Sequence, residues 1–72
     1  MKEVKINTEF ITLGQLIKFV GVISQGGEVK YFLSTNKILV NGEEDNRRGR
    51  KLYNNDVVEV VNKTKYVIRH EN

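Results

Sequence analysis

The stretch ILVNGEEDNRRGRKLYNNDVVEV, residues 38–60, contains two short apolar runs separated by turn signals and a dense charged segment. The first run, Ile38–Val40, ends at Asn41-Gly42, a pair typical of tight turns. The second run, 57–61, follows a cluster of Asn and Asp residues that also favours a turn. The stretch therefore predicts two strands with a charged connection, in which Leu52 is an apolar anchor pointing inward.

The chain before this stretch carries a helical pattern that opens at Thr12. Thr12 is a suitable N-cap, and Gln15 stands three residues later, as a capping box requires. Ile11, just before the cap, is placed to pack on Leu16 as a hydrophobic staple. Apolar residues then recur at helical spacing on one face: Leu13, Leu16, Ile17 and Val20. We expect this helix to end at Gly21, because glycine suits a helix C-terminus.

A second helical pattern follows closely. Its start, near Ser24 or Gln25, includes two glycines, which favour a loose first turn. Its apolar stripe consists of Val29, Phe32 and Leu33. We expect this helix to end at Asn36 in the left-handed conformation, which Asn adopts at low cost.

Both ends of the chain predict further strands. Residues 2–6 alternate polar and apolar side chains, and Tyr66–Ile68 form a last apolar run. We expect this last run to close the sheet beside the N-terminal strand. The order of elements indicates an α+β domain with two short helices packed on a small, mainly antiparallel sheet. Because a chain of 72 residues supports one small core, residues 1–72 are expected to form a single domain.

The composition narrows the class of protein. No cysteine occurs, so disulfides and thiolate chemistry are excluded, and we expect a cytoplasmic location. The longest apolar run is far shorter than the ~20 residues of a membrane span. The N-terminus also lacks the apolar region of a signal peptide. The net charge of +3 favours polyanionic partners, and no membrane partner is expected.

The sequence contains few residues that could form a catalytic or metal-binding motif. His70 is the single histidine, and we expect a passive residue there, close to the C-terminus. The consecutive acids 43–45 lack the spacing and glycine of a calcium loop, and a solvated turn paired with nearby Arg is the simpler interpretation. Gly26-Gly27 lacks the spacing of a phosphate-binding Walker loop. We therefore expect no enzyme activity, no cofactor and no metal.

The basic segment is the best chemical lead. Four of the 12 Lys and Arg residues flank Gly49: Arg47, Arg48, Arg50 and Lys51. Arginine offers a planar donor fork that suits phosphate oxygens, whereas Lys offers a mobile point charge. A solvated loop is an equally good interpretation of the run taken alone. Tyr31 and Tyr53 are candidates for base stacking, whereas Tyr66 and the Phe residues are expected in the core.

Taken together, these features resemble the S4 RNA-binding domain. The resemblance covers residues 12–60, and its most specific part is Val-Asn-Gly at 40–42 followed by Asp-Val-Val-Glu-Val at 56–60. With Gly-Gly-Glu between the helices and NRRGRKL at 46–52, the chain looks most similar to small free-standing bacterial YaaA-type S4 domain proteins. The resemblance implies an S4-like (alpha-L) fold that grips structured RNA.

The resemblance also assigns RNA-contacting positions outside the basic segment. These are the start of the second helix from Gln25, its face at Lys30 and Tyr31, the connection at Lys37, and the turn at Asn41 and Gly42. The tight turn is an equally good interpretation of Asn41. Family members often carry Ser-Arg where this chain has Gln25-Gly26, so one phosphate contact is missing, and the dense basic segment is a candidate substitute. The usual Gly-Asp before the last family strand is Asn55-Asp56 here.

The sequence thus predicts a non-catalytic module for structured RNA. The expected partner is ribosomal RNA, with transfer RNA as another option, on a ribosomal subunit or its precursor in ribosome assembly. The expected state is a monomer. A protein-interaction adaptor, docking on a ribosomal or replication protein through a sheet edge, is the alternative from another class.

Overall fold

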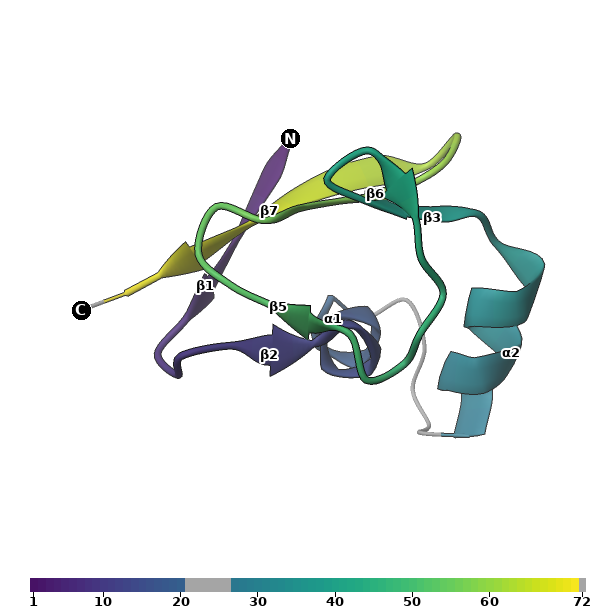
Figure 1. Ribbon diagram of the computed structural model, residues 1–72, viewed down its shortest axis with the longest axis horizontal. Coiled ribbons are helices and arrows are strands. Elements are labelled where there is room, and N and C mark those ends of the chain that lie inside the picture. The colour runs from purple at the N-terminus through teal and green to yellow at the C-terminus, as the bar shows by residue number, and fades with distance from the viewer. Residues whose placement is uncertain (21–26, 72) are drawn as a thin grey trace.

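A computed structural model describes residues 1–20 and 27–71 of the chain. Two helices and seven strands are formed there (Figure 1). They are β1 (Lys2–Ile6), β2 (Ile11–Thr12), α1 (Leu13–Phe19), α2 (Gly27–Thr35), β3 (Ile38–Val40), β4 (Glu43–Glu44), β5 (Lys51–Leu52), β6 (Val57–Val60) and β7 (Thr64–His70).

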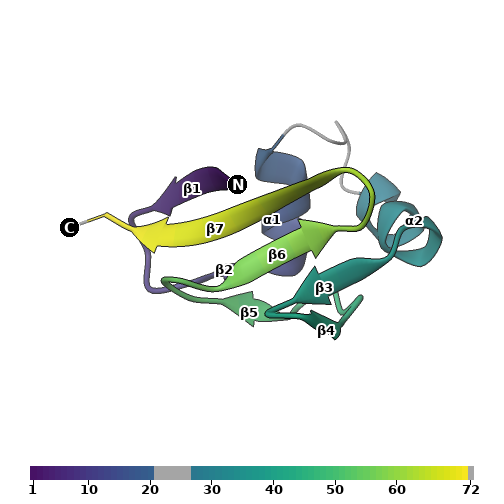
Figure 2. The ribbon, with the colours of Figure 1, turned by 90° about the horizontal axis from the view of Figure 1, so that it is seen from above.

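The main sheet has five strands in the order β1-β7-β6-β3-β4. All its pairings are antiparallel except that of β1 with β7, which is parallel and aligns Val4 with Ile68. A second, two-stranded sheet joins β2 to β5. Both helices lie below the main sheet in Figure 1, and Figure 2 shows α2 beyond the end of the sheet near β3. The expected α+β class and the pairing of the chain ends are confirmed.

Helix α1 begins as its sequence predicts. Thr12 Oγ1 accepts a hydrogen bond from the Gln15 backbone N–H at 3.2 Å, and Gln15 Oε1 accepts one from the Thr12 N–H at 2.8 Å. These two bonds form the predicted capping box. Ile11 packs against the core from the edge. The expected stop at Gly21 lies outside the described residues, and α1 ends at Phe19.

The end of α2 differs from the prediction. Asn36 is not among the residues with positive φ, so it does not form a left-handed cap. Instead, its backbone N–H and its side-chain Nδ2 both donate to the Phe32 carbonyl at 3.0 Å. The side chain thus adds a second donor to a carbonyl in the last turn, and the helix ends without the left-handed conformation at Asn36.

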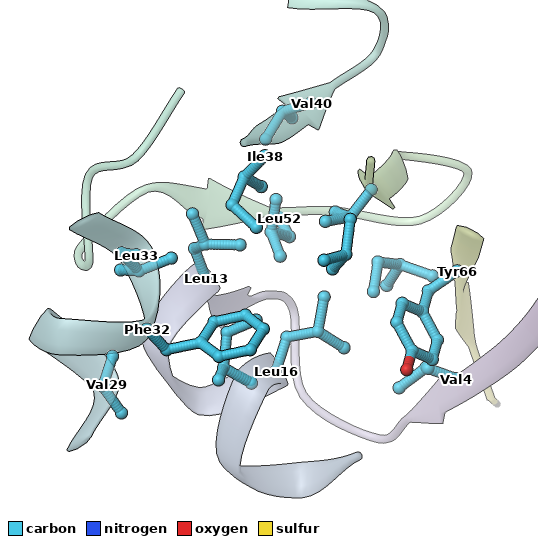
Figure 3. Packing of buried hydrophobic residues seen from close by; sticks show 14 of the residues in the cluster. Val4, Leu13, Leu16, Val29, Phe32, Leu33, Ile38, Val40, Leu52 and Tyr66 are labelled. Atoms are coloured by element: carbon cyan, nitrogen blue, oxygen red, sulfur yellow. The ribbon is translucent and has the colours of Figure 1, made fainter. Parts of the chain in front are cut away.

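The core lies between the main sheet and the two helices (Figure 3). It takes apolar residues from every predicted stripe: Val4, Ile6, Leu13, Leu16, Ile17, Val29, Phe32, Leu33, Ile38, Val40, Leu52, Val58, Val60, Tyr66 and Ile68. Leu52 is completely buried, as expected for the anchor after the basic segment. Burying such a side chain stabilises the fold by about 1.5–3 kcal/mol. Of the Phe residues expected in the core, only Phe32 lies there. Phe10 is half-buried outside the core, and Phe19 is 69% exposed because it lies outside the α1 stripe.

Asn41 and Asp56 lock the two turns at the ends of β3 and β6 together. Asn41 and Gly42 both have positive φ, as the tight turn between β3 and β4 requires. The Asn41 side chain donates from Nδ2 to Asp56 Oδ1 at 3.0 Å and accepts from the Val57 N–H at 2.9 Å. Asn55 also has positive φ, so the turn before β6 is kept without a glycine. The Val-Asn-Gly and Asp-Val-Val segments of the sequence are therefore one interlocked structure.

Two details of the C-terminal half go beyond the predicted strands. Glu43 and Glu44 form the short edge strand β4 and stay exposed, rather than lying in a turn. Strand β7 extends to His70, whose backbone N–H donates to Asn54 Oδ1 at 2.7 Å. His70 is therefore part of the sheet and not a tail residue, and its side chain is exposed.

Candidate nucleic-acid interface

The basic loop, defined as residues 46–51, is fixed to the start of α1. The Leu13 N–H donates to the Arg50 carbonyl at 2.8 Å, and the Gly14 N–H donates to the Arg48 carbonyl at 2.9 Å. Together with the capping box, these bonds satisfy all four N–H groups that a helix start leaves without an intrahelical partner. In Figure 1 the chain between β3 and β5 runs alongside α1. The loop is therefore an ordered part of the fold, and not merely a solvated segment.

Gly14 allows this close approach. A Cβ atom at position 14 would lie 2.9 Å from Arg48 Cγ and 3.2 Å from the Arg48 carbonyl oxygen. Such contacts are tighter than a packed interior accepts without displacement, so a side chain here would push the loop away. The apolar pattern did not single out Gly14. The available signal was a glycine in the first turn of a helix, where glycine costs stability unless a neighbour needs the space.

The docked loop brings Arg48 next to α2. Arg48 and Lys30 line the same open hollow of about 380 Å³, together with Leu33, Ser34 and Asn46. Both cations come from positions predicted to contact RNA, although they are 18 residues apart in the sequence. The neighbouring Tyr31 is 71% exposed, as its position off the apolar stripe predicted. Lys37 is also exposed, at the connection from α2 to β3.

Arg47 and Arg50 are held by one carboxylate. Asp45 Oδ1 accepts from Arg47 Nε at 3.0 Å, and Asp45 Oδ2 accepts from Arg47 Nη2 at 2.7 Å and from Arg50 Nε at 3.2 Å. The side-chain hydrogen bond from Arg47 is the largest cause that lowers the pKa of Asp45 to about 2. Arg50 also donates from Nη1 to the Lys51 carbonyl at 2.7 Å. The prediction that the acids pair with nearby Arg thus holds for Asp45.

Lys51 points to a different part of the surface. Its Nζ lies 4.8 Å from the centre of the Phe10 ring, a cation–π distance. The Phe10 ring contacts the Tyr53 ring in a tilted pair with centroids 5.8 Å apart, and Tyr53 is 42% exposed. The four bases of the loop therefore face three environments: α2, Asp45 and an aromatic pair.

Gln25 lies outside the described residues. Asn41 has both ends of its side-chain amide bonded within the fold, to Asp56 and Val57. This geometry gives Asn41 a structural role, while its contact with RNA stays a prediction.

Other kinds of site find little support in the described residues. Within 1–20 and 27–71, no three His, Asp or Glu side chains gather in a way that could hold a metal ion. Neither described helix is long and apolar enough to cross a membrane.

The fold and the docked loop define a small α+β domain that presents a cationic surface on and around its helices. The S4 domain family matches residues 4–69, and the chain therefore belongs to this family of RNA-binding domains. The match confirms and extends the resemblance seen in residues 12–60. A protein of Bacillus subtilis (strain 168), described as a probable ribosome maturation protein RlbA, is 60% identical over 57 residues. These residues are 79% of this chain and 80% of the relative.

Proposed function

We propose that the chain is a non-catalytic RNA-binding module that acts on structured ribosomal RNA during ribosome maturation in the cytoplasm. The proposed module comprises residues 1–72 and works as a monomer. One observation carries the proposal: docking of the basic loop on α1 places Arg48 beside Lys30 of α2. Membership of the S4 domain family and the description of the Bacillus subtilis relative as a probable ribosome maturation protein support it.

The proposed mechanism is recognition of RNA shape and charge. A-form RNA hides its major-groove base edges, so a small rigid module contacts phosphates, 2′-hydroxyls and unpaired bases. Lys30, Arg48 and Lys37 supply cations on and next to α2, and the exposed ring of Tyr31 is available for stacking. Arg47 adds a further cation, whose side chain is 71% exposed.

The test compares two double variants with equal loss of charge. Lys30→Gln with Arg48→Gln removes two cations from the α2 hollow, whereas Lys2→Gln with Lys5→Gln removes two exposed cations from β1. Affinity for refolded bacterial ribosomal RNA is measured by filter binding. We expect the first variant to lose about tenfold or more in affinity, and the second to lose about twofold or less. Equal losses would place the interface elsewhere.

A sedimentation experiment distinguishes the proposed function from the alternative, a protein-interaction adaptor. Tagged protein is sedimented with ribosomal fractions, with and without RNase, at low and high salt. Association through RNA is abolished by RNase and weakened by salt. Association that survives both treatments would contradict the proposal and support docking on a protein. The described sheet offers that docking only a two-residue edge strand, β4, and the charged edge strand β1, both of which disfavour strand pairing.

A further inference from the structure

An acid, Asp45, lies directly before the basic loop that is expected to bind an anion. The Asp45 side chain is only 13% exposed. It accepts four hydrogen bonds, all from two basic residues: three from Arg47, counting its backbone N–H at 3.0 Å, and one from Arg50. Charge counting alone would treat Asp45 as an unfavourable neighbour for RNA phosphates. Its geometry indicates a different role.

The bonds to Asp45 leave donors free on both guanidinium groups. A guanidinium carries five N–H donors. Arg47 uses two of them, and Arg50 uses one on Asp45 and one on the Lys51 carbonyl. The Arg47 side chain remains 71% exposed despite its bonds. Because Asp45 Oδ2 binds both groups, the two guanidiniums lie side by side with donors still available.

We propose that Asp45 is a positioning residue that holds Arg47 and Arg50 as a preformed fork for RNA phosphates. A free Arg side chain loses much rotamer freedom when it binds a ligand. Here this freedom is already restricted in the folded protein, so less is lost on binding. The inference rests on the proposed function and names the residues that set the geometry of that site.

The decisive comparison uses two neighbouring acids. Asp45→Asn and Glu44→Gln each remove one negative charge, but Glu44 is exposed and makes no ion pair within the described residues. If charge alone matters, both variants bind RNA more tightly than the unaltered protein. If Asp45 positions the arginines, Asp45→Asn weakens binding although the protein becomes more positive, whereas Glu44→Gln leaves binding equal or tighter.

The measurement is the affinity for refolded bacterial ribosomal RNA at constant ionic strength. We expect Asp45→Asn to bind about fivefold more weakly than the unaltered protein. In the NMR spectrum of the free protein, the Nε–H signals of Arg47 and Arg50 should be sharp and protected from exchange, and Asp45→Asn should lose this protection. Binding by Asp45→Asn that equals or exceeds that of Glu44→Gln would overturn the inference.

A second variant covers the case in which Asp45→Asn does not fold. Arg47→Lys keeps the charge and replaces the planar fork by a single ammonium group. We expect weaker binding by about threefold or more, and unchanged binding would contradict the inference. If the unaltered protein fails to bind RNA, the proposed function falls and the Asp45 inference with it. If the unaltered protein binds and only the variants behave otherwise, the Asp45 inference alone is wrong.

Discussion

The contact between Gly14 and Arg48 holds the basic loop in place on α1. Because Gly14 has no side chain, its backbone N–H can donate to the Arg48 carbonyl at 2.9 Å. The aliphatic part of the Arg48 side chain packs over the same position. Arg48 then lines the same hollow as Lys30. A single glycine therefore links the stability of α1 to the geometry of the proposed interface.

Gly14→Ala tests this link at the residue scale. Alanine is the better helix former, but its methyl group would meet the Arg48 backbone at 3.2 Å. We expect a loss of about 1–2 kcal/mol in the free energy of unfolding and a severalfold loss in RNA affinity. Gly49→Ala is a suitable control, because a Cβ there has open space and φ is not in the left-handed region. A stabilised Gly14→Ala protein with unchanged affinity would contradict the contact's role.

At the scale of elements, α1 is a short helix whose start is secured from two sides. The capping box is local, whereas the Arg48 and Arg50 carbonyls come from a segment more than 30 residues away. A seven-residue helix is marginal alone, so its stability depends on these partners and on the burial of its apolar stripe. The start of α1 is accordingly an anchor for the loop and has no free N–H for an anion.

Thr12→Ala tests the capping box. Removing the hydroxyl leaves the Gln15 N–H without its acceptor, so we expect about 1 kcal/mol of destabilisation in urea unfolding. Thr12→Ser keeps the acceptor and should retain most of the stability. Thr8→Ala removes a hydroxyl outside the helix, whose bond goes to the Phe10 carbonyl, and serves as a control. An equal effect of Thr12→Ala and Thr8→Ala would argue against the capping role.

The features that could be predicted are those whose pattern is local. Two local pairs could be predicted in this way: Thr12 with Gln15, and Asn41 with Gly42. The members of each pair are at most three residues apart, so the sequence alone indicates the capping box and the tight turn. The pairing of β2 with β5 and the contact of Gly14 with Arg48 join distant segments, and no spacing indicates them. For the same reason, the sequence predicts the basic residues only as a group. It does not predict that their side chains divide among α2, Asp45 and Phe10.

At the scale of the whole molecule, Asp45 should contribute to acid stability. Its pKa is lowered from 3.8 to about 2 in the folded protein, so the contribution is present above pH 3.8 and is lost as the pH falls toward 2. Solvent screens the exposed Arg47 partner, so we expect only about 1 kcal/mol. Unfolding of the unaltered protein and Asp45→Asn is compared between pH 6 and pH 2. Their stability difference should shrink over that window, and a constant difference would show that the pair does not couple to folding.

At the same scale, the proposed RNA binding depends on counterion release at the cationic surface that the docked loop builds. The most direct measurement is the salt dependence of affinity for refolded bacterial ribosomal RNA. If about five phosphates are neutralised, log K should fall with log salt at a slope of roughly −3.5 to −4.5. Lys30→Gln with Arg48→Gln should make this slope shallower by about 1.5, while Lys2→Gln with Lys5→Gln should leave it unchanged. A slope near zero, or the same slope in both double variants, would contradict the central claim.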